Sequence, residues 1–413
     1  MGWFFMRERT LLIVSAGVEA VHGIRRAKEL GLRVIVSDRD TSAPGFAYAD
    51  DGFEASTYDP QATADAAEDY ARRCGPISGV ITIGADVPLT VATVAARLGL
   101  PGISLEAARL AQDKLAMKAR LAQQGIPVPA FAAIPNLDAL KRHTDTRGLG
   151  YVLKPADSRG GRGVQRLSAV KDLAEAWEVA AGHSPSGRVM VEEFLDGPQI
   201  STESILIDGL GATPGFSDRN YPYLDRYTPY FIEDGGDLPS SLPVPVQADV
   251  KATVEAAGRA LGVKTGNIKG DMVVHNGKPY VIEIAARASG GYFCTREIPL
   301  NTGVDFIGAV IRIALGERVS LSELSPRFER PVVQRYLFPT PGRVVSVRGS
   351  DAASQMPGIE ECLVTVKPGS IIRPPTDSNC TAAMVLATGS SRAEAQMRAA
   401  QALNLIAVET VPL

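Results

Sequence analysis

The first hundred residues alternate between strand-like and helix-like segments, and this alternation constrains the fold more than any other feature of the chain. Strands are expected at 10–15, 33–37 and 79–83, with helices at 19–30, 61–74 and 89–98. Strands connected through helices run parallel in one sheet, because each helix returns the chain to the edge where the strand began. We therefore expect an α/β domain over residues 1–110, with a parallel sheet covered by helices on both faces.

The turn after the first strand does not favour dinucleotide binding. It spans Ser15–Glu19 and carries one glycine, where a dinucleotide-binding turn has three. Asp38 has the spacing of a ribose-binding acid, but without the other glycines the backbone cannot approach a pyrophosphate closely. We therefore set dinucleotide binding aside.

Charge and cysteine pattern exclude several protein classes. The net charge is −3 and the sequence pI about 5.9, so no basic surface indicates nucleic acid or an anionic membrane as a partner. Apolar runs such as 80–83 are too short to span a bilayer, and residues 2–6 are too few for a signal peptide. The four cysteines and four histidines show neither disulfide nor zinc spacing. A cytoplasmic protein is expected.

Beyond residue 104, strands and helices follow a less regular order. Helices are expected at 105–124 (broken near 112), 170–181, 245–261 and 306–315, and strands at 150–155, 189–194 and 199–207. A loop-rich insertion with a cluster of tyrosines is expected at 215–245. From Arg330 the chain turns β-like and rich in proline and glycine, before an amphipathic helix at 392–406.

The stretch 271–291 carries the most chemistry. Asn276 and Gly277 are turn formers between two short strands, one beginning with Asp271 and the other ending near Glu283. Folding this hairpin places the two carboxylates side by side, which suits Mg²⁺ bridging nucleotide phosphates. Arg287 and the small-residue turn Ser289-Gly290-Gly291 follow. The plainer alternative is a hairpin with two solvated acids and a surface arginine.

Two further segments have a weaker chemical signal. Lys154 precedes a loop, Ser158–Val164, whose glycines Gly160, Gly161 and Gly163 can present backbone N–H groups to phosphate oxygens. A tight turn explains these glycines equally well. The second segment is an apolar strand that ends in Glu192, Glu193, Phe194 and Leu195. The backbone groups of this strand can form hydrogen bonds with the edge of a purine base. The alternative is an edge strand with exposed acidic side chains.

Taken together and in order, these segments resemble the ATP-grasp superfamily, and within it the carboxylate–amine ligases. The resemblance covers nearly the whole chain. It implies that ATP binds to Lys114, from the motif Asp113-Lys114-x₃-Lys118, and to Lys154. It also implies a mobile flap at Ser158–Val164 and an adenine-binding hinge at Glu192–Leu195.

The same resemblance assigns the remaining site residues. Asp271 and Glu283 match the two positions that ligate Mg²⁺, with Mn²⁺ as an alternative ion. Arg287 would hold the acyl phosphate or the tetrahedral oxyanion, although it is alternatively a structural ion-pair partner. The turn Ser289–Gly291 and Glu233 would contact the substrate.

The chain departs from the family pattern at three places. Ala285 stands where a metal-ligating Asn is common, which leaves two carboxylates for the metal. Gln199 occupies the position of the ribose-binding acid, and Glu203 is the nearest replacement. The segment 226–233 lacks the His and Lys that biotin carboxylases place near bicarbonate and offers Tyr227 and Tyr230 instead.

The tail narrows the resemblance to L-amino-acid ligases, through the segments 335–342 (RYLFPTPG) and 366–369 (VKPG). The implied fold is α/β and α+β: a Rossmann-like parallel-sheet domain at 1–110, an ATP-grasp domain at 111–325 with its lid at about 125–198, and a small β-rich domain at 326–413. The implied activity joins a small-molecule carboxylate to an amine, with ATP and Mg²⁺. A bicarbonate-using carboxylase and a non-catalytic nucleotide-binding regulator remain alternatives. A homodimer is the default assembly.

Overall fold

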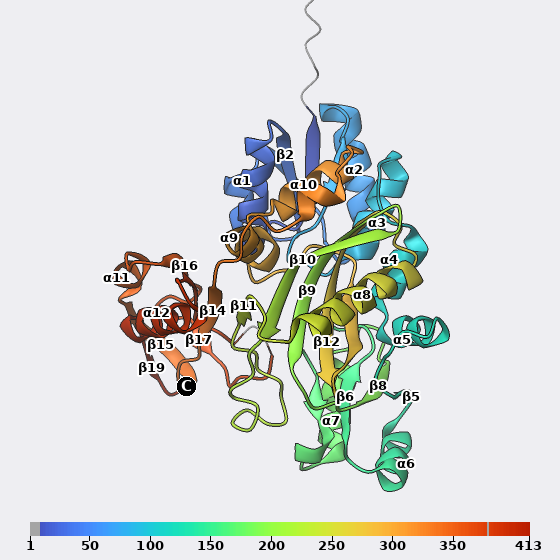
Figure 1. Ribbon diagram of the computed structural model, residues 1–413, viewed down its shortest axis with the longest axis vertical. Helices are drawn as coiled ribbons and strands as arrows, with labels where there is room; N and C mark the ends of the chain where they lie inside the picture. Colours follow the sequence, from blue (N-terminus) through green and yellow to red (C-terminus); the bar gives the residue numbers. More distant parts are fainter. Residues whose placement is uncertain (1–8, 378–379) are drawn as a thin grey trace, which may run out of the picture.

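The computed structural model describes residues 9–377 and 380–413. The apolar stretch 2–6 lies outside the described residues. Figure 1 shows a parallel-sheet unit at the top, a central sheet, a small lid at the bottom and the C-terminal segment at the left. None of the helices within the described residues combines the length and apolar character needed to cross a bilayer.

The N-terminal unit is the expected α/β domain. Its sheet has the order β3-β2-β1-β4, and every pair in it is parallel. The bounds are β1 Thr10–Val14, α1 Val21–Glu29, β2 Arg33–Asp38, β3 Asp51–Glu54, α2 Pro60–Cys74, β4 Gly79–Ile81 and α3 Pro88–Leu98. The short strand β3 was not predicted, because its residues Asp-Gly-Phe-Glu have the composition of a turn.

The predicted break in the helical stretch after this unit is confirmed. Helix α4 spans Leu105–Gln112 and α5 spans Lys114–Gln123. Between them Asp113 has an extended backbone, and its carboxylate accepts hydrogen bonds from Leu115 N and Ala116 N. Asp113 is therefore the N-cap of α5, which makes Lys114 the first residue of that helix.

The lid is a separate four-stranded sheet at the bottom of Figure 1, with the order β5-β8-β6-β7. Two helices pack on it, α6 (Leu137–Arg147) and α7 (Leu173–Gly182). Its strands are β5 Phe131–Ile134, β6 Tyr151–Pro155, β7 Gln165–Arg166 and β8 Val189–Glu193. Strand β6 pairs antiparallel with β8, which places Lys154 opposite Met190, near the start of β8.

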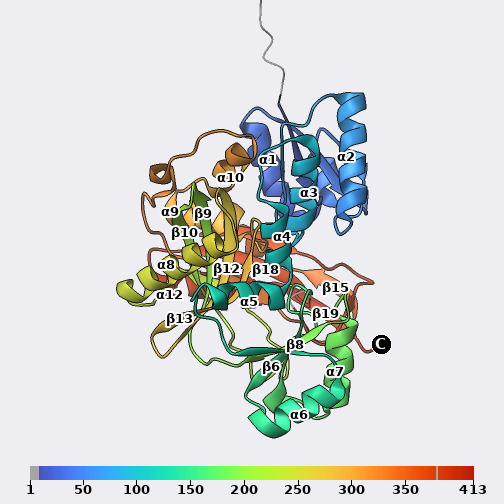
Figure 2. The ribbon, with the colours of Figure 1, turned by 90° about the vertical axis from the view of Figure 1, so that its right-hand side faces the viewer.

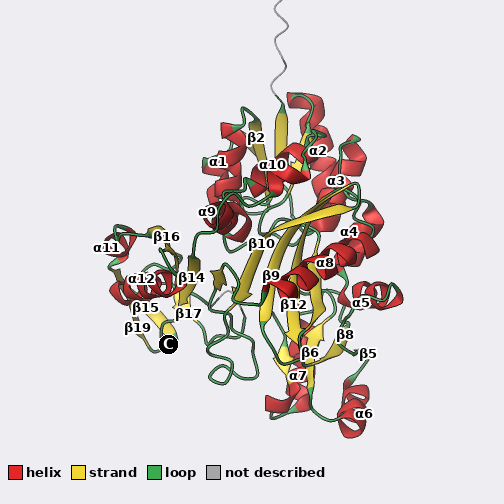
Figure 3. Ribbon diagram, in the orientation of Figure 1, coloured by secondary structure: helices red, strands yellow, loops and turns green. Residues whose placement is uncertain are grey.

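An eight-stranded sheet with the order β13-β12-β9-β10-β11-β14-β18-β16 forms the centre of the molecule. Figure 3 shows helix α8 (Val244–Ala260) crossing one face of its ATP-grasp half. The strands are β9 Gln199–Ile207, β10 Leu210–Arg219, β11 Gly236–Leu238, β12 Gly266–His275, β13 Lys278–Ala285, β14 Val332–Leu337, β16 Ile359–Val364 and β18 Ala383–Thr388.

This sheet crosses the boundary expected at residue 326. Strand β11 pairs with β14 through Leu238 and Val332, so the C-terminal strands extend the central sheet. Helices α9 (Ile298–Thr302) and α10 (Phe306–Ala314) precede this crossing, and α10 packs under the N-terminal sheet. Beyond it, α11 (Ser350–Ser354), α12 (Arg392–Leu405) and a three-stranded sheet complete the tail, visible in red in Figure 2. The strands of that sheet are β17 Ile371–Ile372, β15 Gly342–Arg348 and β19 Ala407–Val411.

The insertion at 215–245 is loop-rich as expected, although β10 continues to Arg219 and β11 lies inside it. The expected start of the strand that carries Asp271 was wrong. Strand β12 begins at Gly266 and not at Asp271, because it also pairs with β9 from Gly266 to Val273. A second strand partner supplies backbone hydrogen bonds that the local sequence does not reveal.

Candidate active site

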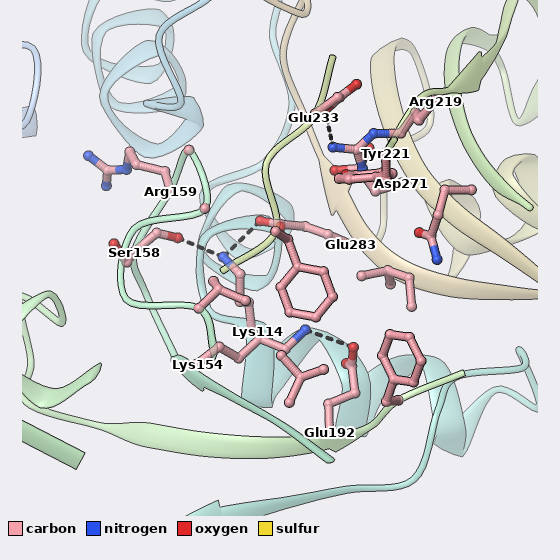
Figure 4. A pocket seen from close by; sticks show the side chains of 18 of the residues that line it. Lys114, Lys154, Ser158, Arg159, Glu192, Arg219, Tyr221, Glu233, Asp271 and Glu283 are labelled. Carbon is pink, nitrogen blue, oxygen red and sulfur yellow. Dashed lines mark hydrogen bonds and ion pairs between the residues drawn. The ribbon is translucent and has the colours of Figure 1, made fainter. Parts of the chain in front are cut away.

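A cavity of about 470 Å³ lies between the lid and the central sheet. Its volume falls within the roughly 300–1,000 Å³ typical of small-molecule sites. Most sequence-predicted ATP-site residues line it: Lys114, Lys154, Ser158, Gly160, Gly161, Glu192, Glu193, Phe194, Leu195, Gln199, Asp271, Glu283 and Arg287. Gly163 is in the same loop but does not line the cavity. Figure 4 shows the charged side chains of this group converging from several elements.

At the lid side, one buried carboxylate neutralises two buried lysines. Glu192 Oε1 lies 2.7 Å from Lys154 Nζ, and Glu192 Oε2 pairs with Lys118 Nζ. Burial alone would raise the pKa of Glu192, but the two ammonium groups outweigh it and hold that pKa below its usual value. Burial lowers the pKa of Lys118 to about 8. The Glu192 side chain is therefore not available to adenine.

Only some backbone groups of the expected hinge, Glu192–Leu195, are free to form hydrogen bonds with adenine. The backbone N–H of Glu193 donates to Ala130 O at 2.7 Å, and that of Phe194 donates to Gly150 O at 2.9 Å. These two donors are thus used inside the lid. Arg166 lies over the Phe194 ring at 4.3 Å, which fixes the ring at the edge of the cavity.

Lys114 links the flap to the central sheet. Its Nζ lies 2.8 Å from Glu283 Oε1 and donates to Ser158 O at 2.7 Å. The side chain is nearly buried, and burial opposes its charge, but Glu283 keeps the pKa of Lys114 above the usual value. The ammonium therefore stays charged beside the loop that is expected to cover phosphates.

Asp271 and Glu283 are directly opposite one another in the β12–β13 hairpin, as expected, because a β-bulge next to Asp271 shifts by one residue the register set by the turn at Asn276–Gly277. Both line the cavity and both are ionised. Burial would raise the pKa of each, but Arg219 and Lys269 lower that of Asp271 to about 2, and Lys114 lowers that of Glu283.

This pair of carboxylates fits a magnesium ion that is shared with phosphates. Two ionised hard-oxygen ligands lie side by side at the wall of the cavity. Ala285, two residues beyond Glu283, adds only a methyl group to that wall. Over the described parts of the chain, no three histidine, cysteine or carboxylate side chains gather closely enough to hold a metal on their own. Phosphate and water oxygens would have to complete the coordination.

Cations surround Asp271 on its other side. Arg219 Nη1 lies 3.0 Å from Asp271 Oδ1, and Lys269 Nζ is paired with the same oxygen. Arg219 Nη2 in turn pairs with Glu233, and the Tyr221 ring lies beside the guanidinium, 5.3 Å from its carbon. Burial raises the pKa of Tyr221, so this phenol stays neutral.

The flap, Ser158–Val164, lies between this cavity and a second one. Gly160, Gly161 and Gly163 all have positive φ, which explains the glycines by the path of the backbone. Arg159 lies 4.4 Å over the Tyr58 ring of the N-terminal unit. The flap therefore contacts the N-terminal unit as well as Lys114.

Glu203 does not replace the ribose-binding acid, and this expectation was wrong. Gln199 lines the first cavity, but Glu203 is four residues, about 13 Å, further along the strand. Its buried carboxylate accepts a hydrogen bond from Ser289 N at 2.6 Å. Burial raises the pKa of Glu203 to about 7. Its contacts support the Ser289–Gly291 turn and not a ribose.

The second cavity, of about 660 Å³, begins where the first one ends. Both are lined by Asp86, Arg219, Glu233, Lys269 and Arg287. The turn Ser289-Gly290-Gly291 lines only the second. Arg287 Nε lies 3.7 Å from Asp86 Oδ1, so the arginine has an acidic neighbour from the N-terminal unit.

The turn at Gly291 is held by residues from the N-terminal unit and from the C-terminal strand β14. Glu19 Oε1 accepts a hydrogen bond from Gly291 N at 2.6 Å, and Gln334 donates to Gly291 O from the C-terminal strand β14. Tyr336 donates to Gln334 Oε1 at 2.8 Å. A Cβ at Gly290 would lie 2.3 Å from Glu19 Oε2, so any larger residue here would push the Glu19 carboxylate aside.

The tyrosines of the insertion divide between two environments. Tyr227 packs on Phe338, with ring centroids 6.1 Å apart, and Tyr223 packs on both. Neither Tyr227 nor Tyr230 lines either cavity, which corrects the expectation that these two replace the His and Lys of the carboxylases. The insertion residues that line the first cavity are Arg219, Tyr221, Leu224, Phe231 and Glu233.

Sequence reasoning missed several residues of the site. The position of Lys118 could have been inferred, because it follows Lys114 by four residues and therefore lies on the same helix face. The position of Lys269 could also have been inferred, because it is two residues before Asp271 and therefore lies on the same face of the strand. Glu19, Asp86 and Arg219 carried no local pattern.

Comparisons with known proteins agree with this geometry. Residues 111–291 match the model of the ATP-grasp domain, and residues 335–411 match L-amino acid ligase C-terminal domain 2. The structure of an L-amino acid ligase from Bacillus licheniformis superposes with a TM-score of 0.81 at 21% identity, covering 98% of this chain and 99% of that one.

Curated relatives match over different shares of their length. The uncharacterized protein y4rH of Sinorhizobium fredii is 26% identical over 89% of this chain and 76% of its own. A D-alanine–D-alanine ligase of Gloeobacter violaceus is 31% identical over 45% of this chain and 63% of its own. The chain therefore contains an ATP-grasp domain followed by a C-terminal domain of the L-amino acid ligase type, and it shares the fold of the L-amino acid ligase structure.

Proposed function

We propose that this protein is an ATP-dependent ligase that forms an amide bond between an amino-acid carboxylate and an amine, through an acyl phosphate, and releases ADP and phosphate. The observation that supports this most directly is the shared boundary of the two cavities. Arg219, Lys269 and Arg287 line both, so a phosphate group in the first would lie beside a substrate in the second.

The first step would place the charge of the triphosphate among buried cations. A carboxylate oxygen attacks the γ-phosphorus of ATP, the bond to the β-phosphate oxygen breaks, and ADP leaves. Lys114 and Lys154 would orient the phosphates, while Asp271 and Glu283 would hold magnesium, which supplies charge neutralisation at the transferred group.

The second step would occur at the boundary between the cavities. The amine nitrogen attacks the acyl carbon, phosphate leaves with the electrons of the C–O bond, and the nitrogen releases a proton. Arg287 is positioned to donate to the developing oxyanion, because its Nε is buried and without a hydrogen-bond partner among the described residues. The flap, with Lys114 bonded to Ser158, would exclude water from the acyl phosphate.

Product analysis tests this proposal. The protein is incubated with Mg²⁺-ATP and pairs of amino acids, and both phosphate release and product mass are measured. We expect slow phosphate release with the carboxylate substrate alone, faster release with the correct amine, and a product lighter by one water than its two precursors.

The alternatives give different products. AMP and pyrophosphate in place of ADP would overturn the proposal. Stimulation by bicarbonate and biotin, without response to any amine, would favour the carboxylase. ATP binding without turnover under every condition would favour a nucleotide-binding regulator.

A further inference from the structure

The second cavity extends away from the nucleotide side to the C-terminal segment. Its wall there is absent from the first cavity and combines ring and aliphatic side chains with one acid. These residues are Tyr292, Phe293, Glu297, Tyr336, Leu363 and Met384. The apolar part of this wall is therefore interrupted by the Glu297 carboxyl group and by the phenols of Tyr292 and Tyr336, and the polar residues Gln334, Thr365 and Thr381 lie at the same end of the cavity.

Glu297 is the unusual member of this wall. It is the last residue of a short π-helical turn, Phe293–Glu297, and is only 3% exposed. No hydrogen bond or ion pair from another described residue reaches its carboxylate, and it lines the cavity. Burial raises the pKa of Glu297 well above the usual range, and the nearby acids Glu233 and Asp237 raise it further.

The arginine whose charge acts on Glu297 is engaged elsewhere. Arg335 opposes the effect of the neighbouring acids but lies 2.7 Å from Asp237 Oδ1, with a further hydrogen bond to the Gln334 carbonyl. The other acids of the cavity have partners of their own. Glu233 is paired with Arg219, and Glu19 accepts from a backbone N–H. A buried carboxylate without a partner destabilises the folded protein, so a cation that enters the cavity would be favoured beside it.

The surroundings of Glu297 specify the shape of such a cation. Phe293, Leu363 and Met384 offer apolar surface on which methylene groups can pack. A bare metal ion would gain nothing from this wall. A cationic head on an aliphatic arm would use both the wall and the carboxylate.

We propose that this part of the second cavity binds the ammonium or guanidinium end of a basic amino acid, so that one of the two joined substrates belongs to the class of lysine, ornithine and arginine. This inference rests on the proposed ligase function, because it assigns the second cavity to an amino-acid substrate. Glu297 is the group that recognises the charge, and the apolar wall holds the methylene arm.

Direct binding measurements test the inference without catalysis. Calorimetry on the full chain compares lysine with norleucine, and arginine with citrulline, which differ in the charge of the side-chain end. A charge-assisted hydrogen bond in a buried site is worth about tenfold to a hundredfold in affinity, so we expect the charged member to bind at least about tenfold tighter. Glu297→Gln should bring this ratio close to one.

Matched variants separate recognition from folding. Glu106→Gln, an exposed glutamate paired with Arg120, should retain the preference. Glu297→Asp keeps the charge on a shorter arm and should retain part of it. Ligand-free Glu297→Gln should melt no lower than the wild type, because it replaces a buried carboxyl group without a partner by a neutral side chain of the same shape, and its stabilisation by Mg²⁺-ATP should be unchanged.

The outcomes distinguish this inference from the proposed function. Equal affinity for lysine and norleucine in the wild type, or an undiminished preference in Glu297→Gln, overturns the inference even if neutral amino acids are ligated. A charge preference that depends on Glu297 supports it even if no amino-acid pair yields ADP, and in that case only the proposed ligase reaction fails.

Discussion

The buried pairing of Glu192 with Lys118 and Lys154 leads to a quantitative prediction. All three side chains are at most 5% exposed. Glu192→Gln keeps the shape of the side chain but leaves two buried ammonium groups without a counter-ion. Removing one partner of a buried ion pair typically costs about 3–5 kcal/mol, and we expect a loss of that size in the free energy of unfolding at neutral pH.

The loss should depend on pH in a defined direction. In the wild type the pKa of Lys118 is about 8, below its ordinary value of 10.5. The unfolded chain therefore binds more protons between these values, and stability rises with pH across that window, by about 3 kcal/mol at 1.36 kcal/mol per pKa unit. Without Glu192 the pKa falls further, so the rise begins at lower pH. The variant's deficit should be larger near pH 6 than near pH 8.5.

Urea unfolding of the ligand-free protein at both pH values measures this effect. Glu193→Gln, the exposed neighbour, is the matched control and should change stability by less than about 0.5 kcal/mol. Adding Lys118→Met to Glu192→Gln removes one of the two ammonium groups that have lost their counter-ion. The double variant should regain more than half of the lost free energy of unfolding. A deficit below about 1 kcal/mol, or one that does not change with pH, would refute the reasoning.

Three further substitutions test other parts of the site. Glu283→Gln should lower ATP turnover at least about a hundredfold, and near-normal turnover would contradict the metal assignment. Since burial raises the pKa of Glu203 to about 7 from 4.5, the folded state binds more protons in that window and stability falls as pH rises through it. Glu203→Gln should abolish this fall, worth about 3 kcal/mol, and parallel melting curves of the two proteins against pH would argue against it. Gly290→Ala would displace Glu19 and should raise KM for the carboxylate substrate while KM for ATP stays constant.

Local sequence patterns anticipated much of the architecture. The alternation of strands and helices predicted the parallel sheet of the N-terminal unit, because period and turn residues act within a few positions. The turn Asn276–Gly277 predicted the hairpin that brings Asp271 near Glu283, but the two residues lie opposite one another only because a β-bulge next to Asp271 shifts the pairing by one residue. The break before Lys114 was also predictable, and the structure shows its cause, the capping side chain of Asp113.

The extent of several strands depended on partners far away in the chain. Strand β10 contains glycine and proline within 210–215, and its pairing with β9 shifts register there, so the local sequence resembled a loop. Its continuation to Arg219 requires β9 on one side and β11 on the other. Backbone hydrogen bonds from such neighbours have no local signature.

The sequence by itself determined which residues could carry phosphate and metal chemistry, because Lys154, Asp271 and Glu283 lie on strands next to their own turns. Only the tertiary structure decided what completes the site. Glu19 and Gln334 both hold Gly291, although they are separated by more than three hundred residues. Such contacts arise when the N-terminal unit and the C-terminal strands pack against the same turn. The same packing buries Glu203 and Glu297. Burial raises the pKa of both carboxyl groups, and Glu297 has no partner among the described residues.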